Sequence, residues 1–158
     1  MKYYYILSFL ILSFTANATV DAGKVLDKFH LAASEANFDE YFKQMAPNAV
    51  FLGTDPNERW SRQEFEAFVA PYFAKGKGWT YEVINRNINS IEGHTDIVFF
   101  DELLDNEYYG LCKGSGLLKR TENGWKIVQY NLSVAVENDV SKPVTTLLKE
   151  YRDKLGSK

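Results

Sequence analysis

The sequence predicts an α+β domain in which helices come first and a meander of antiparallel strands follows. Apolar residues recur at helical spacing before Gly76 and alternate with polar residues from Trp79 onward. The dipeptide Asn123-Gly124 separates the last two long strands, and this pair is typical of a tight hairpin turn. Helices followed by consecutive strands favour a curved sheet with the helices on one side.

The first 18 residues have the order of an export signal. Lys2 precedes an apolar run over residues 3–14, and small residues then end in Ala16-Asn17-Ala18. The run is shorter than the roughly 20 residues that span a membrane. We therefore expect cleavage after Ala18 and a periplasmic or secreted protein, with no membrane contact after cleavage. The alternative is a retained amphipathic or anchoring segment.

Length and charge restrict what the exported chain can be. Removing 18 of 158 residues leaves 140, which fits one domain over residues 19–140 and a C-terminal helix over residues 141–158. Loss of Lys2 leaves 17 basic and 21 acidic residues without a basic stripe, so nucleic-acid binding is not favoured. Cys112 is the only cysteine of the sequence, and its alternating apolar context predicts burial.

Three helices are predicted in the first half of the chain. Residues 21–36 show helical spacing, and Asn37 with Glu40 forms a capping arrangement for a short helix that Pro47 cannot continue. Ser61 and Glu64 form a capping box that opens a third helix. Pro71 should kink or end that helix.

Five strands and a last helix complete the pattern. Residues 49–53 are a compact apolar run suited to a short strand, and residues 54–59 form a loop rich in turn formers. Four further strands are predicted over residues 79–84, 95–104, 108–120 and 125–136, and a helix begins near Ser141.

Two segments carry a family resemblance. Residues 51–55 read Phe-Leu-Gly-Thr-Asp before Trp60, and residues 124–133 read Gly-Trp-Lys-Ile-Val-Gln-Tyr-Asn-Leu-Ser. With the order of elements, they resemble the SnoaL-like domains of the nuclear transport factor 2-like superfamily over about residues 20–138. The resemblance implies a cone-shaped curved antiparallel sheet wrapped around N-terminal helices, with a pocket at its wide end. It also implies that the outer sheet face pairs two subunits.

The last strand should contribute to both the pocket and the subunit contact. Strict alternation places Gln129, Asn131 and Ser133 on one face with Trp125 and Ile127, as a pocket wall that becomes polar toward its mouth. The other face is largely apolar and needs a cover, for which we expect a homodimer partner. The C-terminal helix is the alternative cover. The expected interface residues are Val128, Tyr130 and Leu132.

The resemblance also implies a candidate chemistry. Ketosteroid isomerase and polyketide cyclases of this fold use a carboxylate base in an apolar cavity, and Asp101 or Glu102 near a strand end could supply it. Neighbours on a strand face opposite sides, so at most one points into the pocket. Related domains often carry a histidine where Asn131 stands, and an amide has no proton to exchange near neutral pH. The simpler interpretation is that both carboxylates lie in water.

Metal and cofactor motifs are not favoured. Asp55, Asn57 and Glu66 match three positions of a calcium loop, but Trp60 stands where that loop needs glycine. Two separated histidines and one cysteine do not make a zinc site. The glycines of the third long strand lack the strand-to-helix setting of a phosphate-binding loop. We expect neither a metal nor a cofactor.

Three functions remain after these exclusions. The first is an exported pocket protein that binds a small, partly apolar molecule, and the second is an isomerase, cyclase or hydrolase with Asp101 or Glu102 as base. The third is a dimeric interaction module with a vestigial pocket. A neutral cavity favours the first, a buried carboxylate in the cavity the second, and a filled cavity the third. The expected ligand-binding residues are Trp60, Tyr72, Tyr109, Gln129, Asn131 and Ser133.

Overall fold

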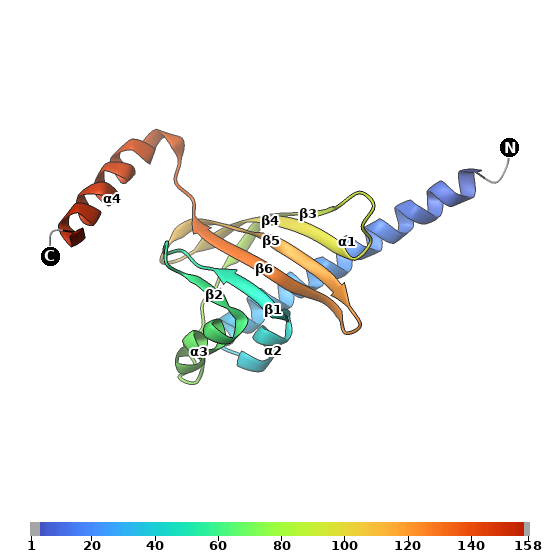
Figure 1. Ribbon diagram of the computed structural model, residues 1–158, viewed down its shortest axis with the longest axis horizontal. Helices are drawn as coiled ribbons and strands as arrows, with labels where there is room; N and C mark the ends of the chain where they lie inside the picture. The colour runs from blue at the N-terminus through green and yellow to red at the C-terminus, as the bar shows by residue number, and fades with distance from the viewer. Residues whose placement is uncertain (1–3, 157–158) are drawn as a thin grey trace.

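The computed structural model describes residues 4–156, with side chains from Thr19 onward, and shows helices packed on a six-stranded curved sheet (Figure 1). This confirms the predicted fold class. The ends of the predicted export signal and C-terminal helix, residues 1–3 and 157–158, lie outside the described residues. The helices are α1 (Tyr4–Ser34), α2 (Phe38–Lys43), α3 (Arg62–Phe73) and α4 (Ser141–Gly156), with a 3-10 turn, η1 (Asn138–Val140). The strands are β1 (Met45–Leu52), β2 (Arg59–Ser61), β3 (Glu82–Ser90), β4 (Ile97–Asn106), β5 (Gly110–Thr121) and β6 (Gly124–Val134).

The sheet has the order β2-β1-β6-β5-β4-β3. The predicted antiparallel meander is confirmed from β3 to β6, where each strand pairs with the next along the chain. β1 instead pairs in parallel with β6, and β2 pairs with β1 in the opposite direction. Two strands from the helical half of the chain therefore extend the sheet beside β6.

The predicted capping signals form as expected. The Asn37 side chain accepts the Glu40 N–H at 3.2 Å, and Ser61 and Glu64 form a reciprocal capping box at the start of α3. Pro71 does not end α3, which continues to Phe73, because the lost N–H belongs to its last turn. None of the helices in the described part of the chain is long and apolar enough to span a membrane.

The strand predicted over residues 79–84 begins later in the structure, at Glu82. The structure places β3 over the asparagine-rich segment, where Asn87 and Asn89 lie opposite β4, whereas Trp79 and Tyr81 precede the strand. Pairing with β4 decides this, since asparagine can occupy an exposed strand face despite its low strand propensity. Trp79 and Tyr81 are then free to pack against the core.

One extra residue in β6 reverses its faces. Leu117 lies opposite Gln129 and Leu118 lies opposite Ile127, so Val128 is the additional residue of a β-bulge. Before the bulge, Ile127 points inward as predicted. Beyond it, Tyr130 and Leu132 are the inward side chains, at 1% and 8% exposure.

The prediction of the two faces of the last strand is therefore wrong past the bulge. Gln129, Asn131 and Ser133 alternate to the outer face, and all three are half-buried there. Tyr130 and Leu132 cannot belong to a subunit interface on that face. The homodimer itself stays a prediction, without these two residues.

The C-terminal helix does not cover the sheet. α4 projects away from the domain (Figure 1), and no side chain in it is buried. Its apolar stripe is exposed instead. The alternative in which this helix covers the outer face is therefore wrong. The exposed apolar residues of α4 are Leu147, Leu148, Tyr151 and Leu155.

Two glycines should respond oppositely to alanine. A Cβ at Gly116, beside the bulge, would collide with the Gln129 carbonyl oxygen and lie 3.0 Å from the Phe100 ring. We expect Gly116→Ala to lower the free energy of unfolding by about 2 kcal/mol. At Gly23 in α1 the added methyl meets only Ile88 at 3.5 Å, so Gly23→Ala should raise it by about 0.5–1 kcal/mol. Urea unfolding of both variants checks this, and a Gly116→Ala variant as stable as the unchanged protein would contradict it.

Candidate functional site

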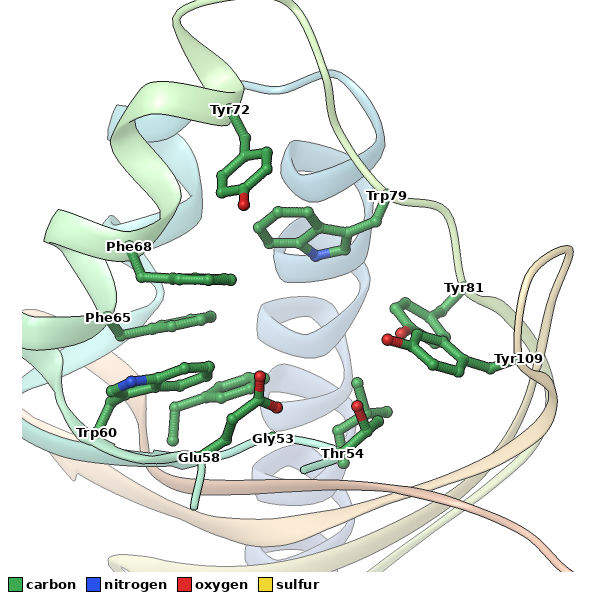
Figure 2. A pocket seen from close by; sticks show the side chains of 12 residues that line it. Gly53, Thr54, Glu58, Trp60, Phe65, Phe68, Tyr72, Trp79, Tyr81 and Tyr109 are labelled. Carbon is green, nitrogen blue, oxygen red and sulfur yellow. The ribbon is translucent and has the colours of Figure 1, made fainter. Parts of the chain in front are cut away.

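A pocket of about 250 Å³ opens beside the β1–β2 hairpin and α3 (Figure 2). Its lining comes from β1, β2, the loop between them, α3, the segment before β3, the turn before β5, and the inward face of β6 past the bulge. Eight of its twelve lining residues are aromatic. The twelve lining residues are Phe51, Gly53, Thr54, Glu58, Trp60, Phe65, Phe68, Tyr72, Trp79, Tyr81, Tyr109 and Leu132.

One wall of the pocket is a stack of nearly parallel rings. Phe51 and Phe65 stack with ring centroids 4.0 Å apart and planes 11° apart. Trp60 continues the stack to Phe68 at 4.8 Å and 22°. Figure 2 shows Phe65 and Phe68 edge-on beside the cavity, with Trp60 below them. Since β1, β2 and α3 each contribute a ring, the wall is held by three elements and presents an apolar surface.

Polar groups also line the pocket, both next to the ring stack and across from it. The hydroxyls of Tyr72, Tyr81 and Tyr109 and the carboxylate of Glu58 point into the space between them (Figure 2). Burial raises the pKa of Tyr81 far above its ordinary value, and the charges of neighbouring groups including Glu58 add to this. Tyr81 therefore keeps its proton and can donate a hydrogen bond into the pocket.

The loop that carries Glu58 is closed by its own hydrogen bonds. The Gly53 N–H donates to the Glu58 carbonyl at 2.8 Å, and the Glu58 N–H donates to the Asp55 carbonyl at 3.0 Å. The Asn57 N–H donates to the Asp55 carboxylate at 2.9 Å. The loop is thus a compact turn, which fixes the position of the Glu58 backbone. Among the side chains that the structure describes, from Thr19 to Gly156, no group of three or more histidine, cysteine or acidic residues could hold a metal ion.

The structure brings together half of the predicted ligand-binding residues. Trp60, Tyr72 and Tyr109 line the pocket. The bulge at Val128 removes the other three, Gln129, Asn131 and Ser133, to the outer face of β6.

Sequence reasoning missed several lining residues because they had a structural explanation. Phe65 and Phe68 fit the apolar stripe of a helix, and Trp79 and Tyr81 fit an alternating strand. Glu58 lies in a loop that showed only turn signals. The one available signal was the spacing of Glu58 and Trp60. Residues two apart in an extended segment point to the same side, so the Glu58 carboxylate should lie on the side of the Trp60 ring.

The two candidate bases lie on opposite faces of β4. Asp101 is exposed on the outer face, where its carboxylate accepts the Asn87 amide at 3.0 Å. Glu102 points inward, is 2% exposed, and does not line the pocket. Of the two, only Glu102 is therefore buried, and its partners decide what it can do.

Glu102 is the centre of a buried ionic network. Its Oε2 accepts the Tyr130 hydroxyl at 2.8 Å and lies 3.0 Å from His30 Nε2. Its Oε1 accepts Arg86 Nε at 2.5 Å, and a second Arg86 nitrogen donates to Asp27 at 2.5 Å. The network connects α1, β3, β4 and β6. Both carboxylate oxygens are thus used within the fold.

These partners hold Glu102 in its charged form. Burial by itself raises the pKa of this carboxyl, but the hydrogen bond with His30 and the charge of Arg86 outweigh burial and lower the pKa below 4.5. A carboxylate with a lowered pKa is a poor proton acceptor near neutral pH. Gly114 makes room for this arrangement, because a Cβ there would collide with the Tyr130 hydroxyl. The geometry favours a structural role for Glu102.

Removal of this buried charge should cost stability. Glu102→Gln leaves Arg86 without its buried counter-charge, so we expect a loss of about 3 kcal/mol. Asp101→Asn, an exposed neighbour, should change the free energy of unfolding by less than about 0.5 kcal/mol. Chemical denaturation of both variants measures this.

The pH dependence gives a second readout. A lowered pKa in the folded state contributes stability that is complete above the unfolded value of about 4.5 and is lost as pH falls through the lower folded value. The Glu102→Gln variant should lack this component of the acid transition. An acid transition unchanged in that variant would contradict the network as described.

Comparison with known proteins places the fold. A protein-family model described as "SnoaL-like domain" matches residues 23–137. No curated protein matches the chain. An NTF2-like protein of unknown function from Pseudomonas putida is similar in structure, with a TM-score of 0.66 at 8% identity, over 80% of this chain and 92% of that one.

Two further solved structures agree with this placement. An uncharacterised protein with a cystatin-like fold from Caulobacter vibrioides has a TM-score of 0.66 at 11% identity, over 83% of this chain and 98% of that one. A protein of unknown function with a cystatin-like fold from Nostoc punctiforme has a TM-score of 0.62 at 13% identity, over 77% and 93%. At these identities the likeness shows the fold alone. Because the family model covers most of the chain, this protein belongs to the SnoaL-like domain family.

Proposed function

We propose that this protein binds a small, partly apolar molecule in the aromatic pocket. The observation that carries the proposal is the open cavity of about 250 Å³ with eight aromatic residues in its lining. Pockets for drug-sized ligands begin at roughly 300 Å³. The ligand is therefore smaller than a typical drug and fits between the ring stack and the tyrosine hydroxyls.

The two sides of the pocket suit two parts of such a ligand. The stacked rings of Phe65, Trp60 and Phe68 favour a flat apolar group, since burying apolar surface and stacking both contribute to affinity. The hydroxyls of Tyr72, Tyr81 and Tyr109 can form hydrogen bonds with a polar substituent. A molecule with an aromatic body and one polar end satisfies both sides.

The alternatives have less support. The enzyme hypothesis rested on Asp101 or Glu102, yet Asp101 faces outward and Glu102 is held by partners away from the cavity lining. A vestigial pocket would be filled by its own side chains, whereas this cavity is open. The one carboxylate in the lining, Glu58, is half-buried, so it is not the buried base that an enzyme of this kind needs. Binding is therefore the function that the geometry favours.

The binding proposal can be tested with 1-naphthalenemethanol, a neutral aromatic alcohol. Phe68→Ala removes a ring that is 40% exposed and stacks on Trp60, so it should weaken binding about tenfold. Tyr151→Ala removes an exposed ring on α4, outside the pocket, and should leave the dissociation constant unchanged. Isothermal titration calorimetry measures both. Equal affinity in the Phe68→Ala variant would place binding elsewhere.

We also propose that residues 1–18 direct export and are removed. α1 continues through Ala18, and the first buried side chain described in it is Ala22. Cleavage after Ala18 would therefore leave every described core contact of α1 intact.

The export proposal predicts a specific N-terminus. Protein recovered from the periplasm or medium should begin at Thr19 by intact-mass measurement, because small residues at positions 16 and 18 fit signal peptidase. Replacing Ala16 and Ala18 with phenylalanine should leave the full-length chain uncleaved. Mature protein that still begins at Met1 in the unchanged chain would refute the cleavage site.

A further inference from the structure

The charge of the pocket restricts the class of ligand more than its shape does. Among the twelve lining residues, all within the described part of the chain, Glu58 is the one charged side chain. The lining holds no lysine, arginine or histidine that could compensate it. A ligand that enters the pocket therefore meets a single negative charge surrounded by aromatic rings.

Glu58 has no cationic partner among the residues that the structure describes. Its Oε2 accepts the backbone N–H of Asp55 at 3.0 Å, and no ion pair involves its side chain within residues 19–156. The neighbouring Arg59 is exposed and alternates to the other side of β2. The Glu58 charge is thus available to a ligand.

The local backbone directs this carboxylate into the cavity. A Cβ at position 53 would collide with Glu58 Oε2 and lie 3.0 Å from Glu58 Cβ, so Gly53 leaves the space that the side chain occupies. The turn hydrogen bonds of the loop fix the same residue from its backbone. Figure 2 shows the carboxylate beside Trp60, facing the hydroxyls of Tyr81 and Tyr109.

The aromatic lining strengthens the preference for a cation. A positive group within about 6 Å of a ring face is attracted by the ring quadrupole, most strongly for tryptophan. Trp60 and Trp79 lie on either side of the cavity. A half-buried carboxylate in such a lining loses part of its hydration, and an opposite charge from the ligand offsets that loss.

We infer that the pocket selects an organic ammonium ion with an aromatic or apolar body, with Glu58 as its counter-charge. This inference rests on the proposed function, because it names the class of ligand for the same pocket. An anionic ligand meets repulsion from Glu58 and finds no basic side chain in the lining. A neutral ligand of the same shape gains the ring contacts and the tyrosine hydrogen bonds, but no attraction to the Glu58 charge.

Three probes of equal shape separate charge from shape. They are 1-naphthylmethylammonium, the neutral 1-naphthalenemethanol and the anionic 1-naphthoate, titrated calorimetrically at neutral pH and 0.15 M salt. The ammonium should bind about tenfold more tightly than the alcohol, since hydrogen bonds to a charged group add this much. The carboxylate should bind most weakly of the three.

Variants of the loop assign the preference to Glu58. Glu58→Gln removes the charge while its amide oxygen can still accept the Asp55 N–H, so it should lower ammonium affinity about tenfold and leave alcohol affinity unchanged. Gly53→Ala keeps the charge but displaces the carboxylate, and should have the same effect. Glu122→Gln, in the exposed β5–β6 turn, makes the same change in net charge and should have no effect.

The outcomes distinguish the two proposals. If the alcohol binds the unchanged protein as tightly as the ammonium, or if Glu58→Gln and Gly53→Ala both keep full ammonium affinity, the cation preference is wrong and the binding pocket stands. If none of the three probes binds, the proposed function is wrong as well. A tenfold ammonium preference lost in both loop variants and kept in Glu122→Gln supports the inference.

Discussion

The extra residue that Val128 inserts into β6 changes the face of the sheet to which the rest of that strand points. Tyr130 then enters the interior, where its hydroxyl reaches Glu102 and its ring stacks on Phe51 at 5.6 Å. Leu132 reaches the floor of the pocket. The buried ionic network and the cavity therefore depend on the same local irregularity, although their side chains come from different elements.

The network around Glu102 determines how α1 lies on the sheet. His30 and Asp27 come from α1, and Arg86 from the strand farthest from β1 and β2. A buried ion pair adds little net stability over well-packed apolar residues, because desolvation opposes the attraction between the charges. Its larger effect is to disfavour other positions of α1 on the sheet. A shift of α1 by one residue would leave a charge unpaired inside the protein, so the network favours one register of helix and sheet.

The sequence predicted the features that local chemistry decides. Ser61 with Glu64 caps α3, and Asn123-Gly124 turns β5 into β6, because each signal acts within a few residues. The bulge left one signal, the change after Ile127 from apolar to polar residues on the face that begins with Trp125. The same pattern also fits a pocket wall that becomes polar toward its mouth, so it did not decide between the two. The Glu102 network left no signal, because His30 and Glu102 are 72 positions apart and their contact depends on the final packing. The bulge is why half of the expected pocket residues were wrong, and the long-range contacts are why the role of Glu102 stayed open.

The pocket and the hydrophobic core share side chains. Phe51 and Phe65 are buried members of the core, and the same rings form the pocket wall. Substitutions at these two positions would alter folding together with recognition. Thr54, Glu58 and Tyr109 line the same pocket but do not belong to the buried core. A lineage that acquires a new ligand on this scaffold would therefore vary these three positions first, while the shared rings stay fixed by the demands of folding.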